Sequence, residues 1–190
     1  MYAYGRGKTR LIIIALAVLM AATRFHHFGS PFSLPDASLA VFFMGGLYLG
    51  GLAPFGLLLA EACAIDYAAI AYAGVSDYCI SPAYVFLIPT YAVLWMAGRQ
   101  VQRPGFFEKN AALGAVFLLI VSTSLAFVIS NGSFYLFSDR FSDLSWFDYT
   151  KSVVFEYYPL YMLSTLVYVS IPLGIRIFSQ ARDIRKLEFR

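Results

Sequence analysis

Charged residues are scarce in this chain of 190 residues, because Asp, Glu, Lys and Arg together make up only 13% of it. A soluble domain carries about 25% charged residues. Hydrophobic residues make up 60% of the chain, and its mean hydropathy is +0.70. This composition excludes a disordered chain, a nucleic-acid-binding domain and an ordinary cytosolic enzyme, and it predicts an integral membrane protein.

Motifs for common enzyme chemistry are missing. The sequence contains no Walker motif, GxSxG, HExxH or CxxC, so P-loop ATP hydrolysis, serine hydrolysis, zinc proteolysis and dithiol oxidation lack their residues. The 2 cysteines, Cys63 and Cys79, are too few for a disulfide framework. The 2 histidines, His26 and His27, are adjacent, which disfavours a membrane haem because its axial ligands lie on facing helices.

The apolar runs predict six helices. They cover about residues 11–24, 36–49, 54–73, 83–98, 111–131 and 153–176. Six spans of about 20 residues leave no room for a separate soluble domain. The second run is short, so it needs local bilayer thinning or burial among neighbours. Residues 133–151 are predicted to form a long loop, and Pro89 a kink in the fourth helix.

Positive charge is clustered along the chain. Most of the 14 Lys and Arg residues fall in three groups, which are Arg6, Lys8 and Arg10; Arg99, Arg103 and Lys109; and Arg176, Arg182, Arg185, Lys186 and Arg190. An even number of spans places all three groups and both termini on one side, which the positive-inside rule identifies as the cytoplasm. We therefore predict an all-α, six-helix integral membrane protein, with one transmembrane domain over 1–190 and cytoplasmic termini.

The first apolar run has an alternative interpretation. Its basic start and the small residues Ala21 and Ala22 also resemble a secretory signal peptide. We favour an uncleaved helix, because several more spans follow it.

Two acids, Glu61 and Asp66, lie inside the third predicted helix. A charge in hydrocarbon costs about 2.5–3.5 kcal/mol near the bilayer centre, so such residues face a polar cavity or a partner. Asp66 is about seven residues from the helix end at Ala73, roughly 10 Å beneath the outer surface. That depth suits the floor of an outward-facing pocket, with a packing hydrogen bond or a protonated acid as the alternative. Glu61 is interpreted as structural, with a proton relay as the alternative.

Cys79 lies in the outer-loop segment DYCISPAY, residues 77–84. A thiol in this loop could be a soft metal ligand, a nucleophile or an inert side chain. His27 could reach a pocket shared with Cys79 and Asp66, or lie at the membrane interface. Cys63 is expected to be a small core residue.

Aromatic residues are enriched in the predicted outer loops. They are Phe25, Phe28, Phe32, Tyr78, Tyr84, Phe134, Tyr135, Phe137, Phe141, Trp146, Phe147 and Tyr149. They could line a cavity for a large, flat, partly apolar ligand, and interfacial anchoring explains many of them equally well. Ala17 and Ala21 form a small-xxx-small pair in the first helix, which lets another helix of this chain or of a partner approach closely.

Six short helices, the Ala17 and Ala21 pair and an outer pocket resemble the S components of energy-coupling-factor vitamin transporters. Residues 66–84, with Cys79 in DYCISPAY, resemble the BtuM family of cobalamin-specific S components of Gram-negative bacteria. The resemblance implies that Cys79 is an axial thiolate ligand to the cobalt of cobalamin. It also implies that Asp66, Tyr84 and His27 line the pocket near the corrin ring, and that Ala17 and Ala21 meet a transmembrane coupling subunit.

The resemblance therefore predicts binding and uptake of cobalamin (vitamin B12) across the inner membrane, alone or with a coupling subunit and ATPases. No other cofactor and no nucleic-acid partner are expected. The thiolate of Cys79 could also displace an exchangeable upper ligand of cobalt, including cyanide, as an accessory activity. Two alternatives stay open: an S component for another vitamin, and a membrane thiol or haem redox protein that uses Cys79 and His27.

Overall fold

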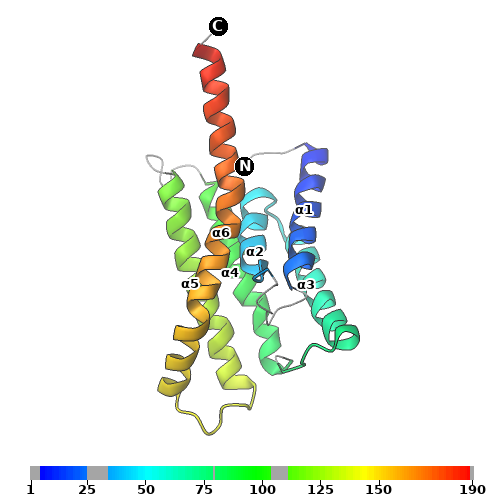
Figure 1. Ribbon diagram of the computed structural model, residues 1–190. Coiled ribbons are helices and arrows are strands. Elements are labelled where there is room, and N and C mark those ends of the chain that lie inside the picture. The colour runs from blue at the N-terminus through cyan, green and yellow to red at the C-terminus, as the bar shows by residue number, and fades with distance from the viewer. Residues whose placement is uncertain (1–4, 25–33, 79, 104–110, 189–190) are drawn as a thin grey trace.

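The computed structural model describes residues 5–24, 34–78, 80–103 and 111–188. Its elements are α1 (Arg6–Arg24), α2 (Ser38–Tyr48), α3 (Leu52–Ala73), the 3₁₀ helix η1 (Pro82–Phe86), α4 (Leu87–Val101), α5 (Ala111–Phe137) and α6 (Trp146–Glu188). No strand occurs in these residues, which confirms the predicted all-α class. Both chain ends lie toward one end of the bundle, whereas the loops 74–81 and 138–145 lie at the other (Figure 1), which we call the pocket end.

The short helix α2 lies at the centre of the bundle. Every residue from Ser38 to Leu47 is buried, and α1, α3, α4 and α6 all pack against it. Its 11 residues span only about 16 Å. Of the two explanations that the sequence left for this short apolar run, the structure therefore shows burial among neighbouring helices.

Helices α2 and α4 approach each other backbone to backbone. A Cβ atom on Gly46 would overlap the carbonyl group of Trp95, and one on Gly98 would overlap that of Phe43. Glycine permits such close crossings because it has no side chain to keep the helices apart. This crossing therefore restricts the position of α4 relative to α2.

Two helices extend past their apolar runs into polar sequence. Helix α1 begins at Arg6 rather than near residue 11, and α6 ends at Glu188 rather than near residue 176. Arg, Lys, Gln and Glu are good helix formers. The apolar run therefore marks only part of each helix, and the helix itself is longer.

The predicted long loop over residues 133–151 is wrong. Helix α5 continues past Asn131 to Phe137, and α6 already begins at Trp146. The side-chain amide of Asn131 donates a hydrogen bond to the carbonyl oxygen of Phe127, at 3.0 Å. Because this polar side chain is satisfied within its own helix, it does not end the helix as the sequence suggested.

Prolines lie within helices α4 and α6. Pro159 and Pro172 lie inside α6. Each proline inside the helix leaves one backbone carbonyl oxygen without its intrahelical donor. Pro89 lies in the first turn of α4, where a missing N–H removes no intrahelical bond. The predicted kink is instead a change from 3₁₀ to α-helix between η1 and α4.

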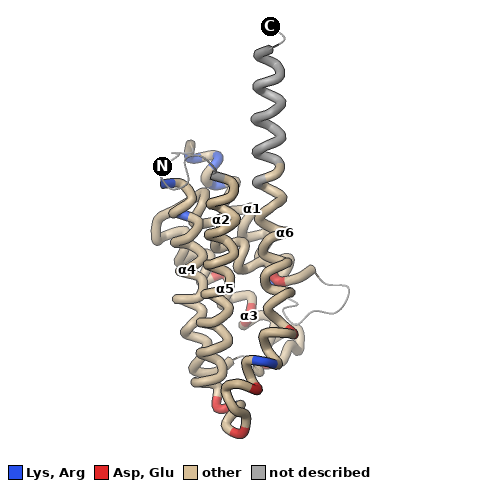
Figure 2. Tube along the Cα trace, turned by 90° about the vertical axis from the view of Figure 1, so that its left-hand side faces the viewer, with Lys and Arg blue, Asp and Glu red and all other residues tan. Residues whose placement is uncertain are grey.

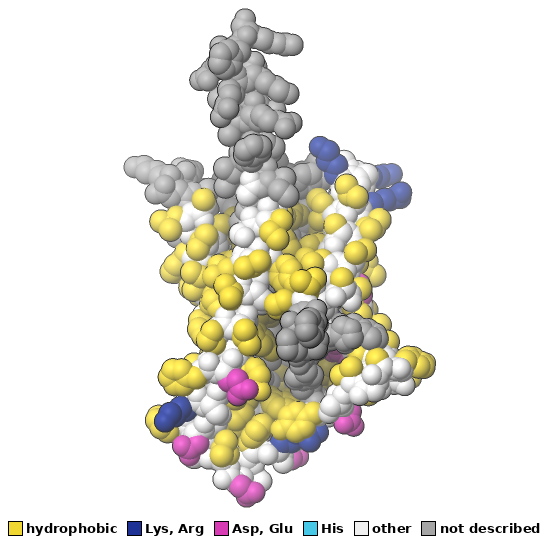
Figure 3. Space-filling model, viewed as in Figure 1, with side chains coloured by type: hydrophobic (Ala, Val, Ile, Leu, Met, Phe, Trp, Pro, Cys, Tyr) yellow, Lys and Arg dark blue, Asp and Glu magenta, His cyan; other side chains and the backbone are white. Residues whose placement is uncertain are grey.

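The surface of the bundle is strongly apolar between its two ends. In the described residues, Leu52–Ala73 and Ala112–Phe137 are long and apolar enough to cross a membrane. Large hydrophobic side chains are exposed on several helices, among them Val18 (62%), Leu52 (81%) and Phe155 (78%). Figure 3 shows hydrophobic side chains over the middle of one face, with charged side chains at both ends. In Figure 2, Lys and Arg gather where α1 begins, and Asp and Glu are concentrated toward the pocket end.

The α2–α4 crossing predicts the effect of a small substitution. Gly98→Ala would place a methyl group against the carbonyl of Phe43, so we expect the free energy of unfolding to fall by about 1–3 kcal/mol. Thermal unfolding of the protein in detergent micelles, followed by circular dichroism, measures the change. The control is Gly56→Ala in α3, where an added Cβ meets nothing within 4 Å and stability should be unchanged or higher by up to about 1 kcal/mol. Equal unfolding midpoints for the two variants would contradict the prediction.

Candidate functional site

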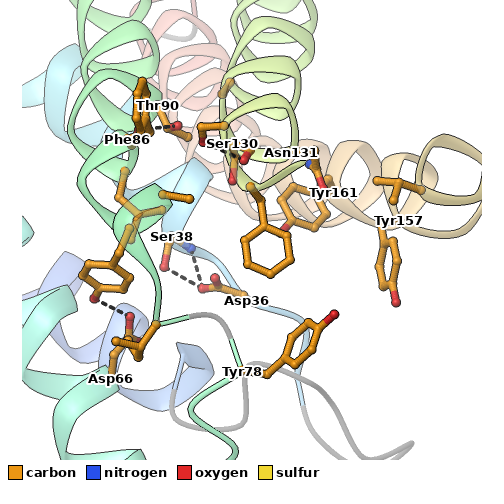
Figure 4. A pocket seen from close by; sticks show the side chains of 18 of the residues that line it. Asp36, Ser38, Asp66, Tyr78, Phe86, Thr90, Ser130, Asn131, Tyr157 and Tyr161 are labelled. Carbon is orange, nitrogen blue, oxygen red and sulfur yellow. Dashed lines mark hydrogen bonds between the residues drawn. The ribbon is translucent and has the colours of Figure 1, made fainter. Parts of the chain in front are cut away.

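A pocket of about 400 Å³ lies among the helices, at the end of the bundle that carries the loops 74–81 and 138–145. Small-molecule sites range from about 300 to 1,000 Å³. Side chains from all six α-helices, from η1 and from the loop 74–81 line it. Figure 4 shows Asp66, Asp36, Tyr78, Asn131 and Tyr161 around the open centre. The site therefore depends on the whole bundle rather than on one local motif.

A bidentate ion pair forms the floor of the pocket. Nε of Arg24 donates to Oδ1 of Asp66 at 2.7 Å, and Nη2 donates to Oδ2 at 2.6 Å. The Arg24 side chain is 2% exposed and the Asp66 side chain 16%. Arg24 ends α1 and Asp66 lies in α3, so the pair joins these two helices. Charge-assisted, two-point pairs of this kind are among the stronger polar contacts in proteins.

Helices α2 and α4 bind the same guanidinium group. Nη1 of Arg24 donates to the hydroxyl oxygens of Ser38, at 2.9 Å, and Tyr91, at 2.7 Å. The hydroxyl of Ser38 donates in turn to Oδ1 of Asp36 at 2.6 Å, and Oδ2 of Asp36 lies 3.6 Å from Nη1. One buried cation thus connects four helices and two carboxylates.

Tyr84 completes the coordination of Asp66. Its hydroxyl donates to Oδ2 of Asp66 at 2.7 Å. Tyr84 lies in η1, which begins at Pro82, and the fixed φ of proline favours the first position of a helix. The structure therefore brings together Asp66 and Tyr84, two of the residues predicted for the pocket.

The other predicted pocket residues, Cys79 and His27, lie outside the described residues. Tyr78 and Ile80, the chain neighbours of Cys79, both line the pocket. Cys63 was expected in the core, and this expectation is wrong because the residue is exposed. The reason is that α3 lies at the edge of the bundle, where only Leu58, Ala62 and Ala69 of its 22 residues are buried.

The remaining predicted residues lie on the outer helices. Glu61 is half-buried in α3 and does not line the pocket. In α1, Ala17 packs partly against the core, whereas Ala21 is exposed. Among the described residues, packing therefore leaves Ala21 uncovered.

Aromatic side chains form one wall of the pocket. Tyr78, Phe134, Phe141 and Tyr149 line it, with ring centroids 5.8 Å apart for Tyr78 and Phe134 and 4.7 Å apart for Phe141 and Tyr149. The guanidinium carbon of Arg140 lies 4.2 Å from the centroid of the Tyr78 ring, within cation–π range. These contacts connect the loops 74–81 and 138–145 beside the pocket.

Tyr149 also holds the first turn of α6 against α5. Its hydroxyl donates to the carbonyl oxygen of Asn131 at 3.0 Å. Burial raises the pKa of Tyr149 to about 12, with smaller contributions from Tyr78 and Tyr157. The hydroxyl is therefore protonated at neutral pH. Trp146 and Phe147, also predicted among the outer aromatics, are exposed and do not line the pocket.

Four residues of the polar network, Arg24, Asp36, Ser38 and Tyr91, were not identified from the sequence as site residues. One signal existed for Arg24, because it follows an apolar run and belongs to none of the three basic groups. An acid within an apolar helix needs a partner, and Arg24 is the basic residue that the fold brings to Asp66.

Comparisons with known proteins do not assign this site. A scan against protein-family models finds no match to the chain, and a search of curated proteins finds none either. Within the described residues, no group of three or more His, Cys, Asp and Glu side chains could hold a metal ion. The structural evidence about function therefore comes from the pocket and the residues that line it.

The ion pair predicts strong coupling between its two partners. Arg24→Met should lower the free energy of unfolding by about 3 kcal/mol, because it leaves the partly buried carboxylates of Asp66 and Asp36 without their cation. Asp66→Asn should also destabilise, and the double variant should lose clearly less than the sum of the two losses. Unfolding in detergent micelles measures all three.

The matched control for this cycle is Lys151→Met, since Lys151 is exposed. A surface change of this kind should shift stability by no more than about 0.5 kcal/mol. Strictly additive losses for Arg24→Met and Asp66→Asn would show that the pair does not act as a unit.

Proposed function

We propose that this chain binds cobalamin as a BtuM-type S component and takes part in its uptake across the bacterial inner membrane. The observation that supports this is the lining of one pocket by Asp66, Tyr84 and both chain neighbours of Cys79. The sequence resemblance assigns Asp66 and Tyr84 to the pocket near the corrin ring, and it assigns Cys79, which follows Tyr78 and precedes Ile80 in the chain, to the cobalt. Because cobalamin is the transported ligand, the cobalt belongs to the cargo.

In the proposal, Cys79 supplies the axial ligand. The corrin occupies four equatorial positions of cobalt and leaves the axial positions open to exchange. A thiolate is a soft donor for a transition metal, and binding to the metal lowers the pKa of a thiol. Tyr78 and Ile80, which flank Cys79 in the chain, both line the pocket.

The walls of the pocket suit the two kinds of surface on a corrinoid. The aromatic wall of Tyr78, Phe134 and Phe141 offers flat apolar area to a face of the ring. Ser130 and Asn131, on the same helix as Phe134, also line the pocket and offer hydrogen-bonding groups to the peripheral amides. The pocket is partly open, so a macrocycle could place one face inside and leave the remainder outside.

We also propose that all six helices lie within the membrane, with cytoplasmic termini. The apolar middle zone and the exposed side chains of α1, α3, α5 and α6 support this arrangement. A coupling subunit would contact α1 at Ala17 and Ala21, and the exposed Ala21 leaves room for a closely packed helix. Co-purification of such a subunit with the wild-type chain and its loss in Ala21→Leu would test this contact.

The role of Cys79 predicts a spectroscopic difference between two serine variants. Purified wild type mixed with cobalamin should retain about one cobalt per chain and show a changed corrin absorption spectrum, because the axial ligand changes. Cys79→Ser should lose this spectral change. Cys63→Ser is the matched control, since Cys63 is an exposed free cysteine, and it should behave as wild type.

The same samples test ligand exchange with cyanocobalamin. If the thiolate of Cys79 takes the upper axial position, cyanide leaves with the thiol proton as hydrogen cyanide, and no oxidant or reductant is needed. Identical spectra and cyanide contents for wild type and Cys79→Ser would overturn the role of Cys79. Absence of any retained corrinoid would overturn the proposed function, and a haem Soret band in its place would favour a redox protein.

The proposed topology predicts the accessibility of two positions. In a chain with Cys63 and Cys79 replaced by Ser, Asp143→Cys should react with a membrane-impermeant maleimide in intact spheroplasts. Lys8→Cys should react only after lysis. Both positions are exposed in the structure, so burial does not limit either reaction. Labelling of Lys8→Cys before lysis would contradict the cytoplasmic placement of the N-terminus.

A further inference from the structure

The described residues that line the pocket include more acidic than basic side chains. Its lining includes three acids, Asp36, Asp66 and Glu156, but among the described lining residues Arg24 is the one Lys or Arg. The remaining polar groups of the lining are hydroxyls and the amide of Asn131. With the acids ionised, the described lining has a net negative charge.

The positive charge of Arg24 is directed at the protein itself. Its Nε and Nη2 atoms bond the two oxygens of Asp66, and Nη1 bonds the hydroxyls of Ser38 and Tyr91. The side chain is only 2% exposed. Arg24 therefore offers little to an anionic ligand, which would have to take donors away from existing buried bonds.

The acids face the pocket more openly than the base does. The side chain of Asp36 is 21% exposed and that of Asp66 16%, and Glu156 lines the pocket from α6 as an exposed residue. Figure 4 places Asp36 near the middle of the pocket, between Asp66 and Tyr161. An ionised carboxylate accepts hydrogen bonds and donates none.

We infer that this pocket selects its ligand by charge. It takes a large macrocyclic ligand whose ring substituents are neutral carboxamides, and it rejects the same skeleton when one of those substituents is a carboxylate. The inference rests on the proposed function, because it takes this pocket as the ligand site. Its physical basis is that a partly enclosed pocket screens charge less than open solvent does, so a ligand carboxylate opposite Asp36 or Glu156 is repelled.

The inference also narrows the class of ligand. Amide N–H groups can donate to the carboxylates that line the pocket, whereas a carboxylate would meet only acceptors there. Vitamins that bind through a free carboxylate therefore do not suit this floor. The alternative of an S component for a carboxylate-bearing vitamin is disfavoured on the same ground.

The experiment compares two forms of one ligand. Cobalamin and a set of its monocarboxylate derivatives, each with a different peripheral amide hydrolysed, are titrated into the purified full-length chain in detergent micelles. Calorimetry at neutral pH gives the dissociation constants. At least one monocarboxylate should bind about tenfold or more weakly than cobalamin, as expected for a like charge placed opposite an acid in a poorly screened site.

Two variants test the origin of the discrimination. Glu156→Gln and Asp36→Asn should each reduce the ratio of the two dissociation constants several-fold, because each removes one negative charge from the lining. Asp143→Asn removes the same charge from an exposed loop residue that does not line the pocket, and it should keep the wild-type ratio.

The outcomes separate the inference from the proposed function. If cobalamin binds and no monocarboxylate is weaker by more than about twofold, charge selection is wrong and the proposed function stands. A wild-type ratio retained in both Glu156→Gln and Asp36→Asn would likewise overturn the inference. If neither cobalamin nor any derivative binds, the proposed function fails and the inference fails with it.

Discussion

The buried charge of Arg24 is the constraint on which the rest of this structure depends. A cation at 2% exposure is tolerated only when paired and hydrogen-bonded, since its desolvation would otherwise be prohibitive. The partners come from different helices: Asp66 from α3, Ser38 from α2 and Tyr91 from α4. Satisfying one guanidinium group therefore fixes the relative positions of four helix segments, and the floor of the pocket is the surface that they leave exposed.

The apolar core and this polar network share a residue. The ring of Tyr91 stacks on Phe42 with centroids 4.1 Å apart, while its hydroxyl accepts a hydrogen bond from Arg24. Phe42 lies in α2, whose position against α4 is set by the glycine crossing at Gly46 and Gly98. Packing of the two central helices thus determines where the network can form. A pocket built in this way is preorganised, because its polar groups are held in place before a ligand enters.

Much of the fold could be predicted from the distribution of apolar residues. The all-α class and the approximate location of each helix follow from apolar runs separated by Gly, Pro and charge. The helix ends could not be predicted in the same way, as residues 133–151 show. Asn131 and Gly132 signalled a stop, yet Asn131 bonds its own helix and Phe134 packs into the pocket wall. Tertiary contacts of this kind override local stop signals, and they are not visible in a single stretch of sequence.

The candidate site, like the fold, could be predicted only in part from the sequence. The sequence by itself determined that an acid, Asp66, lies inside an apolar helix and needs a polar partner, because an unpaired charge is costly in an apolar environment. Only the tertiary structure decided that the partner is Arg24, which lies 42 residues away along the chain. It also decided that Tyr84 and Asp36 join the same network. Composition and periodicity describe what each segment must bury, whereas the choice of partners depends on how the helices pack, and that packing is a property of the whole chain.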